Sequence, residues 1–305
     1  MDEAAYRGAS FLDDRMFAAP LETRLCSLDD ALEEANSTGR NDARWIFHIG
    51  HVGSTLVARL LGELDGLLSI REPRSLRDLT FVAEAEKVGV AAALRRLMSR
   101  TFAADQLALV KATSFVSEQA PLLAADAPAL FLYASPANYI ASILAGENSV
   151  KELAALHEVR AARLRSRGID LAGYGRTDAH RAAAAWACEM TSLETAAAAM
   201  TSSRILWADF DLMLRDMGRW IEQCAVHFDF AAPREKVEQL VNGSLMRRYS
   251  KALEYDYSPS LRAELLDQAA TLHRTDIADA LTALRRDAAA IPMLARAFGR
   301  AEQES

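Results

Sequence analysis

A short glycine-containing segment of this chain combines the residue types that bind anions. It reads Gly50-His51-Val52-Gly53-Ser54-Thr55, and it stands between an apolar run that begins at Trp45 and a helical apolar pattern that reaches Leu61. A strand that ends in a glycine turn and opens a helix directs backbone N–H groups and the positive end of the helix dipole to one point, which favours a phosphate or sulfate there. The segment therefore predicts an anion-transfer site.

The same segment differs from the phosphate-binding loop of nucleotide triphosphatases. That loop reads GxxxxGK[ST], and its lysine reaches the phosphates. Here Ser54 directly follows Gly53 where the lysine would stand, and no glycine lies five positions before Gly53. The segment thus has the shape of a phosphate-binding turn without the ATP chemistry.

Polar residues also follow the other apolar runs of the sequence. In an open α/β sheet, ligands bind outside the carboxyl ends of the strands, so the residues that follow the strands are brought together. Those after the later runs include cations, hydroxyls, carboxylates and an aromatic: Arg71, Glu72, Arg74, Lys111, Thr113, Ser114, Ser135, Ser142, Trp207 and Asp209. We expect them to meet the glycine segment at one edge of a sheet.

Alternation of short apolar runs with helical patterns predicts the fold. After the first run, four more cover residues 67–70, 107–110, 130–133 and 205–208, as in buried parallel strands. The chain from Ser149 to Met200 reads as almost wholly helical, and most of the last hundred residues do too. We predict an α/β fold with a doubly wound, mainly parallel sheet of about five strands, like that of P-loop NTPases, and a large helical C-terminal part.

Length and charge limit the organisation of the chain and its partners. With 305 residues, 51% of them apolar, the chain can bury one sizeable core. We expect residues 1–43 to be an N-terminal extension packed on the core, and residues 44–305 to be a single domain with a helical insertion at about 149–200. A net charge of −7 gives no global basic field, which argues against a nucleic-acid partner.

The cysteines and the N-terminus point to a reducing compartment. Cys26, Cys188 and Cys224 are widely spaced and contain no CxxC pair, which favours buried thiols over disulfides or a zinc site. The acidic N-terminal residues lack an apolar signal core, and no uncharged apolar run approaches about 18 residues. We expect a soluble cytoplasmic protein with no membrane partner.

The glycine segment resembles that of the sulfotransferases that use 3′-phosphoadenosine 5′-phosphosulfate (PAPS). The first loop of this family reads roughly PKSGT[TS] or PRSGST and binds the 5′-phosphosulfate. Gly53, Ser54 and Thr55 match its glycine, serine and threonine, and His51 falls where the family has its basic residue. The resemblance implies that these residues, together with Val52, bind the donor.

Two later segments resemble family motifs in the same order. Leu109 to Thr113 is similar to an apolar strand that ends in KTH, with Lys111 on the lysine and Thr113 in the place of the histidine base of the cytosolic members. Leu132 to Ser142 resembles the segment RxxxxxxxS that holds the 3′-phosphate, with Ser142 on the serine. Ala134 stands where the arginine is expected, which is a departure from the family pattern.

Two more segments extend the resemblance over roughly Arg44 to Lys251. Leu206-Trp207-Ala208-Asp209 resembles LFYED, which puts Trp207 at the aromatic position near the adenine, and Met246-Arg247-Arg248 resembles the MRKG segment that clamps the 3′-phosphate. Glu72-Pro73 and the run Arg248-Tyr249-Ser250-Lys251 are similar to bacterial sulfotransferase-like sequences with an HxGST loop. The resemblance implies PAPS as donor, bound also by Ser142, Trp207, Arg247 and Arg248, and no metal.

Sulfuryl transfer suggests roles for three of these residues. The reaction is an in-line displacement, so the protein mainly has to position the reactants and neutralise charge. His51 and Lys111 would bind and polarise the phosphosulfate, and an adjacent anion would favour the charged imidazole. Glu72, the only carboxylate at an early strand end, is the candidate base for the acceptor.

Each candidate also has a structural interpretation. His51 could be hydrogen-bonded within the turn, and Lys111 could form an ordinary ion pair. The other structural interpretations are a salt bridge from Glu72 to Arg71, Arg74 or Arg77, a backbone hydrogen bond for Ser142, helix-end exposure for Arg247 and Arg248, core packing for Trp207, and a solvated face or acceptor lid for the arginine-rich span 150–167.

We therefore expect a PAPS-dependent sulfotransferase that acts on a hydroxyl or amine of a small-molecule or peptide acceptor. The sequence is compatible with a monomer or an oligomer and does not identify the acceptor. One alternative is a P-loop kinase that uses ATP, in which Asp209 alone would have to hold magnesium. A second alternative, motivated by Ala134 and Thr113, is a sulfotransferase-like binding protein that has lost its donor.

Overall fold

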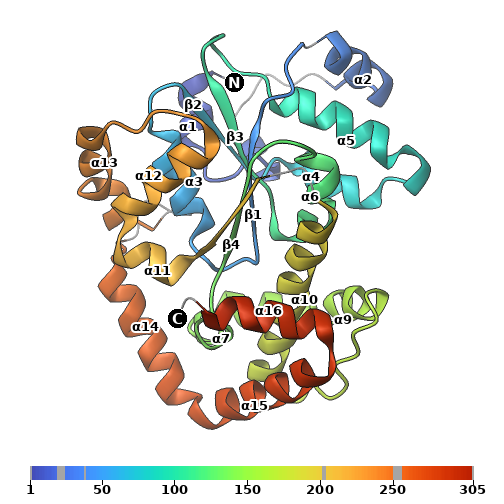
Figure 1. Ribbon diagram of the computed structural model, residues 1–305, viewed down its shortest axis with the longest axis vertical. Helices are drawn as coiled ribbons and strands as arrows, with labels where there is room; N and C mark the ends of the chain where they lie inside the picture. Colours follow the sequence, from blue (N-terminus) through green and yellow to red (C-terminus); the bar gives the residue numbers. More distant parts are fainter. Residues whose placement is uncertain (1, 19–24, 38, 201–203, 250–255, 304–305) are drawn as a thin grey trace.

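A five-stranded parallel sheet lies at the centre of the computed structural model, which describes residues 2–18, 25–37, 39–200, 204–249 and 256–303 (Figure 1). The strand order is β2-β3-β1-β4-β5. The strands are β1 (Arg44–His48), β2 (Leu67–Arg71), β3 (Leu107–Lys111), β4 (Ala129–Tyr133) and β5 (Ile205–Asp209). The predicted α/β fold with a parallel sheet of five strands and a large helical C-terminal part is confirmed.

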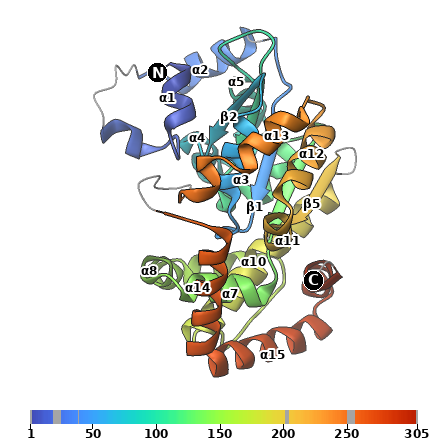
Figure 2. The same ribbon diagram turned by 90° about the vertical axis from the view of Figure 1, so that its left-hand side faces the viewer.

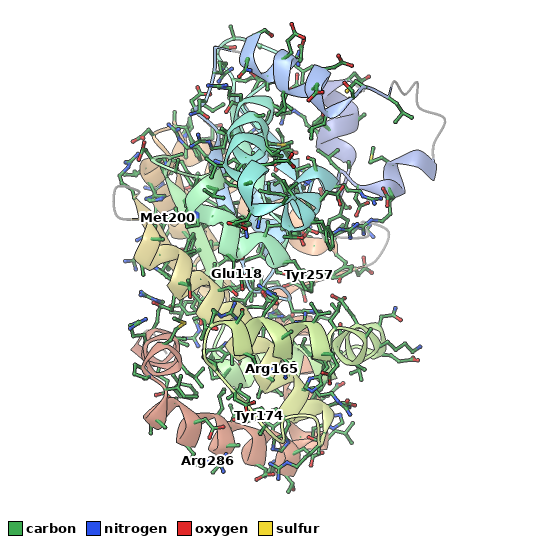
Figure 3. The ribbon with its side chains drawn as sticks, turned by 90° about the vertical axis from the view of Figure 1, so that its right-hand side faces the viewer. Glu118, Arg165, Tyr174, Met200, Tyr257 and Arg286 are labelled. Carbon is green, nitrogen blue, oxygen red and sulfur yellow. The ribbon has the colours of Figure 1, made fainter. Side chains whose placement is uncertain are left out.

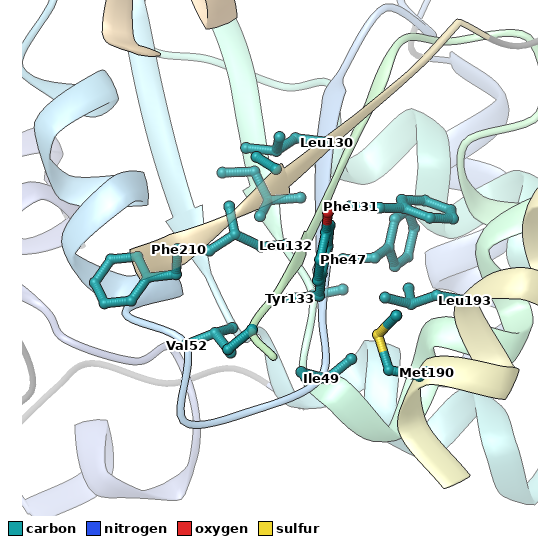
Figure 4. Close-up of a cluster of buried hydrophobic side chains, with 14 of the residues drawn as sticks. Phe47, Ile49, Val52, Leu130, Phe131, Leu132, Tyr133, Met190, Leu193 and Phe210 are labelled. Atoms are coloured by element: carbon teal, nitrogen blue, oxygen red, sulfur yellow. The ribbon is translucent and has the colours of Figure 1, made fainter. Parts of the chain in front are cut away.

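The sheet is buried on both faces because most positions of its strands are apolar. Along β4, Leu130 and Leu132 pack toward one face, and Phe131 and Tyr133 pack toward the other (Figure 4). This alternation is the period of two that a strand imposes on its side chains. Phe131 meets Phe47 of β1 edge to face, with ring centroids 5.7 Å apart. Continuous apolar runs therefore form strands here, as expected for a parallel sheet.

Helices cover both faces of the sheet, with α3 and α12 on one side and α5, α6 and α10 on the other (Figure 1). The helices and 3-10 turns around the sheet are α1 (Glu3–Gly8), η1 (Asp14–Ala18), α2 (Leu28–Ser37), α3 (Ser54–Gly62), α4 (Arg74–Asp78), η2 (Leu79–Phe81), α5 (Glu84–Met98), η3 (Ser114–Gln119), α6 (Ala120–Leu123), α11 (Phe210–Arg215), α12 (Met217–Phe228), α13 (Arg234–Val241) and η4 (Ser244–Arg247). The chain leaves β1 toward β2 and leaves β4 toward β5. Since these directions are opposite, a crevice opens at the carboxyl ends of the neighbouring strands β1 and β4.

A second group of helices lies beyond the carboxyl ends of the strands (Figure 2). They are α7 (Pro136–Leu144), α8 (Glu147–Ala155), α9 (His157–Ser166), α10 (Asp178–Ala199), α14 (Pro259–Leu272), α15 (Arg274–Ala290) and α16 (Pro292–Gln303). The long helix α10 packs against most of them, and α14 runs from the side of the sheet to α15. This helical group lies below the sheet in the view of Figure 2.

The cysteines only partly follow the sequence-based expectation. Cys188 and Cys224 are buried thiols, whereas Cys26 is exposed. The prediction for Cys26 was wrong, because the residue stands before α2 in an exposed stretch of the N-terminal region. Burial raises the pKa of the Cys188 thiol to about 11 and that of Cys224 to about 12. Within the described parts of the chain, no helix is both long and apolar enough to cross a membrane.

Stability should fall in mild acid because a buried histidine, His180, links α10 to α15. Burial and the charge of Arg176 lower the His180 pKa below its ordinary 6.5, against the opposite influence of Asp279. The unfolded chain then binds the proton at a higher pH than the folded protein does. The contribution of His180 to the free energy of unfolding is therefore fully present above about pH 6.5. It is lost as the pH falls toward the folded-state pKa.

Urea unfolding at pH 7.5 and pH 5.5 measures this effect. His180→Gln should reduce the difference between the two midpoints, because one proton acceptor of the unfolded chain is removed. Burial also lowers the pKa of His227. This residue should therefore still cause part of the loss of stability in acid in the variant. A midpoint difference that is the same in wild type and His180→Gln would contradict the prediction.

Candidate functional site

The glycine segment forms a tight turn between β1 and α3. Gly50, His51 and Gly53 all adopt left-handed backbone conformations, with φ of +80°, +53° and +59°. A left-handed conformation is uncommon for a histidine, and such residues cluster at ligand sites. N–H groups that converge in a turn of this kind, at the start of a helix, form a concave site for an anion. The turn thus has the shape that the sequence predicts.

Gly53 also allows a close approach between the turn and α11. A Cβ built on Gly53 would lie 1.8 Å from Cζ of the buried Phe210. Figure 4 shows Phe210 beside Val52, the buried apolar residue of the turn. The guanidinium of Arg262, held by Asp211 at 2.9 and 3.1 Å, lies 5.1 Å from the Phe210 ring centre. Phe210 therefore supports the turn from behind, which only a glycine permits.

The first residues of α3 carry an unsatisfied hydroxyl. Ser54 and Thr55 are both buried, with Thr55 1% exposed. Its Oγ1 has no hydrogen-bond partner among the described residues. A buried hydroxyl without a partner costs free energy, and such a group in a native protein calls for a partner. A ligand oxygen held at the N-terminus of α3 would supply one.

The two histidines of this region have different surroundings. His48 accepts from the Gly50 N–H through Nδ1 at 3.0 Å, so its Nε2 carries the proton that bonds the Ala112 carbonyl at 2.9 Å. His48 is thus a neutral ring that fixes the turn. His51 lines the cavity described below, and its ring meets that of Tyr139 edge to face at 6.2 Å. His51 is therefore the histidine that a ligand in the turn would meet.

Two predicted site residues, Glu72 and Lys111, form an ion pair with each other. Lys111 Nζ contacts Glu72 Oε1, and the Glu72 N–H donates to the Lys111 carbonyl at 2.7 Å. Lys111 is 1% exposed, and Glu72 adopts a left-handed conformation with φ of +48°. His48 Nε2 lies 3.9 Å from the same Oε1. Both contacts therefore engage one oxygen of the Glu72 carboxylate.

The salt bridges predicted for Glu72 with Arg71, Arg74 or Arg77 are absent from the described residues, and that interpretation was wrong. Arg71 instead donates to the backbone carbonyls of Tyr6, Arg7 and Ala9, and burial lowers its pKa to about 10. Arg74 pairs with Asp14. The cause is geometric: a left-handed residue at the strand end turns the Glu72 side chain toward the neighbouring strand β3.

The N-terminal segment covers this ion pair. The Leu12 N–H donates to the Arg71 carbonyl at 2.7 Å, and the Arg74 N–H donates to the Leu12 carbonyl at 3.1 Å. Phe11 is thereby held with its ring centre 5.7 Å from Lys111 Nζ. The Arg15 guanidinium lies 3.7 Å from the same ring centre. Sequence reasoning missed both residues, because nothing in the residue pattern of the extension places it at the strand ends.

A cavity of about 620 Å³ joins the turn, the N-terminal segment and helices α7, α8, α9 and α14. The predicted site residues that line it are His51, Val52, Gly53, Ser54, Thr55, Glu72, Ser142 and Arg248. Lys111, Trp207 and Arg247 are not among the described lining residues. The strand-end argument thus brings most of the predicted residues to one cavity and leaves three outside.

The three residues outside the cavity have partners of their own. Lys111 lies behind Glu72 and would act through it, instead of binding a ligand directly. Trp207 packs against the core aromatic Phe131, and the Arg300 guanidinium covers it at 3.8 Å. Arg247 donates to the Asn242 carbonyl at 2.8 Å. The predicted adenine contact of Trp207 is therefore blocked by α16, a helix that the sequence could not place.

Ser142 and Arg248 line the cavity but are already engaged. The Ser142 hydroxyl donates to the Tyr139 carbonyl at 2.8 Å, one turn back in α7, which leaves its lone pairs as acceptors. Arg248 pairs with Asp256 at 3.0 Å. Ser250 and Lys251, which belong to the resembling run after Arg248, lie outside the described residues. To donate to a ligand, Ser142 and Arg248 would each have to give up a hydrogen bond or ion pair within the protein.

Ala134 and Thr113 are the two residues that depart from the sulfotransferase sequence pattern. Ala134 is fully buried, and its carbonyl accepts from Trp186 Nε1 at 3.0 Å, so no arginine would fit there. Thr113 lines the cavity.

Asp209, the magnesium ligand of the kinase alternative, instead caps α11 by accepting from the N–H groups of Asp211 and Leu212. Within the described ranges, no group of three or more His, Cys, Asp or Glu side chains is placed to hold a metal ion.

The arginine-rich span 150–167 is a solvated face only in part: Arg165 is exposed, but for the other three arginines of the span that interpretation was wrong. Arg160, Arg163 and Arg167 are largely buried, and they pair with Glu118 and Glu189. Arg160 also lines the cavity, as does Arg262, and sequence reasoning missed both. The signal was the pair of glutamates inside the alanine-rich helix α10, Glu189 and Glu194, because a buried Glu requires a cation beside it.

Comparisons with known proteins give distant matches among solved structures. No protein-family model matches the sequence, and a search of curated proteins found no match. Among solved structures, the chain is similar to a sulfotransferase domain from the curacin biosynthetic pathway, with 13% sequence identity and a TM-score of 0.45. The match covers 74% of this chain and 89% of that domain. A likeness this distant does not assign a function to the chain.

Proposed function

We propose that the protein transfers a sulfuryl group from PAPS to a hydroxyl or amine of an acceptor. The observation that supports this most strongly is the turn at residues 50–55, which has three left-handed residues before α3 and a buried Thr55 hydroxyl with no hydrogen-bond partner among the described residues. His51 stands in this turn in place of a lysine. The same turn carries the sequence resemblance to PAPS-dependent enzymes.

Some residues around the cavity would bind the donor, and others would act on the acceptor. The turn and Thr55 would hold the phosphosulfate, and His51 would donate a hydrogen bond to the charge that develops on the leaving phosphate. Glu72 would take the proton of the acceptor while the acceptor oxygen or nitrogen forms a bond to sulfur and the bond from sulfur to the phosphate oxygen breaks. Lys111 would orient the Glu72 carboxylate, as a positioning residue.

Calorimetric titration separates this proposal from its alternatives. The wild-type protein should bind adenosine 3′,5′-bisphosphate without magnesium. Binding of ATP that requires magnesium would instead favour the kinase, and binding of neither nucleotide would favour a protein that has lost its donor.

His51→Asn should weaken binding of the bisphosphate by about 10- to 100-fold, which is the loss of one charge-assisted hydrogen bond. Asparagine is a suitable replacement because it tolerates the left-handed conformation of residue 51. His273→Asn, at the start of α15, serves as the matched control and should bind as wild type does. Equal affinities of all three proteins would remove His51 from the donor site.

A further inference from the structure

Three arginines and two carboxylates form a buried cluster between α9, α10 and η3, which we call the arginine cluster. Glu189 Oε1 lies 3.4 Å from Arg160 Nε and 3.0 Å from Arg163 Nη1. Glu118 Oε1 lies 3.2 Å from Arg163 Nε and also contacts Arg167. The three guanidinium side chains are 6%, 14% and 8% exposed. Figure 3 shows Glu118 above the helix that carries Arg165.

The arginine cluster carries more positive than negative charge. Three guanidinium groups share two carboxylates, which leaves one positive charge uncompensated. The other titratable groups of the cluster are neutral, because burial raises the pKa of Cys188 to about 11 and that of Tyr139 well above its usual range. Glu152, which lines the same cavity, is exposed and forms no ion pair with any described residue. An excess charge in a buried place is costly unless an anion joins it.

Arg160 is the member of the cluster that could meet such an anion. It lines the cavity beside Ser142, Ser149 and Phe115, and its guanidinium lies 5.5 Å from the Phe115 ring centre. Its Nη1 is buried and has no hydrogen-bond partner among the described residues. Its bond to Glu189, at 3.4 Å, is long for a charge-assisted pair. Arg160 thus lines the cavity and carries one buried donor, Nη1, that no described residue satisfies.

The other described arginines of the cavity wall are each matched by a carboxylate of their own. Arg15 pairs with Asp13, Arg248 with Asp256 and Arg262 with Asp211. These pairs neutralise their charge without a ligand. Arg160 differs from them, because the Glu189 carboxylate that it contacts is shared with Arg163.

We propose that Arg160 binds an oxyanion of a ligand in the cavity, separate from the group held by the turn at residues 50–55. The oxyanion is a carboxylate, sulfate or phosphate, since the planar guanidinium offers two parallel donors to such groups. It belongs either to the acceptor or to a second phosphate of the nucleotide. The assignment to acceptor or nucleotide rests on the proposed function, whereas anion binding by Arg160 does not.

Stability measurements distinguish ligand binding from a structural role. Arg160→Gln leaves two arginines and two carboxylates in the cluster, so its urea midpoint should equal or exceed that of wild type. Arg163→Gln removes the arginine that bridges both carboxylates and bonds Ser192 at 3.0 Å, so its midpoint should fall. Arg165→Gln, an exposed position on α9, is the matched control and should unfold as wild type does (Figure 3).

Binding measurements then identify the source of the oxyanion. The probes are adenosine 3′,5′-bisphosphate, adenosine 5′-monophosphate, and inorganic sulfate titrated into the bisphosphate-loaded protein, each with wild type, Arg160→Gln and Arg165→Gln. A loss of about 10- to 100-fold in Arg160→Gln for the bisphosphate, with the monophosphate unaffected, places the second phosphate of the nucleotide at Arg160. The same loss for sulfate alone places the acceptor's anionic group there.

Two results would overturn the proposal. In the first, Arg160→Gln binds all three probes as Arg165→Gln does. In the second, Arg160→Gln is destabilised like Arg163→Gln and loses affinity for every probe equally, as expected of a structural residue. If the wild-type protein binds neither nucleotide, the proposed function fails, and titration of sulfate into the unliganded protein still tests Arg160.

Discussion

Gly53→Ala should lower the free energy of unfolding by more than about 3 kcal/mol or prevent folding, which is the largest effect we expect of a single substitution. The added Cβ would lie 1.8 Å from the buried Phe210 ring, and residue 53 has a φ of +59° that alanine adopts only with strain. Neither the turn nor α11 can move without disturbing the other, because Phe210 begins α11 directly after β5. Urea unfolding followed by circular dichroism measures the loss.

Gly50→Ala is the matched control for this prediction. Residue 50 has a φ of +80°, but its nearest described neighbour, Ser114 Oγ, would lie 3.7 Å from the new Cβ. Only the backbone strain remains, which costs about 1 kcal/mol. Combining Gly53→Ala with Phe210→Leu should recover part of the loss. Effects of Gly53→Ala and Phe210→Leu that simply add would show that the contact is not the cause.

Glu72→Gln should destabilise the protein by about 3 kcal/mol, more than Lys111→Met does. Removing the carboxylate charge leaves the Lys111 ammonium, 1% exposed, without its counter-ion. Removing the lysine leaves Glu72, whose side chain is 21% exposed and can still be hydrated in part. The asymmetry in burial thus predicts the order of the two effects.

The double variant Lys111→Met with Glu72→Gln completes a thermodynamic cycle. Its loss of stability should be smaller than that of Glu72→Gln alone, since no uncompensated charge remains. Chemical denaturation at pH 7 provides all four free energies. Additive losses would mean that the two side chains do not interact, and the role of Lys111 as a positioning residue for Glu72 would then fall.

The same cycle bears on the proposed base. If Glu72 acts on the acceptor, Glu72→Gln should retain affinity for adenosine 3′,5′-bisphosphate, because the turn at residues 50–55 is intact. Parallel loss of stability and nucleotide affinity would instead assign Glu72 a purely structural role in holding the strand ends.

The strands and the glycine turn could be predicted because their signals are local. Continuous apolar runs of four or five residues form buried parallel strands, and a glycine turn that opens a helix has few conformations to adopt. Each prediction depends on residues within about ten positions of one another, and such short-range patterns are present in the unfolded chain. The sequence alone therefore determined the sheet, the turn and the edge at which polar residues gather.

Tertiary structure alone decided which of those polar residues line the cavity. The strand order makes β2 and β3 neighbours, which pairs Glu72 with Lys111 and withdraws the lysine from the cavity. Arg300, from a helix near the end of the chain, covers Trp207, and Glu189 draws Arg160 into a buried cluster. These contacts join residues that are at least 29 positions apart in the chain. Burial, charge pairing and access depend on such contacts, and no local pattern encodes them.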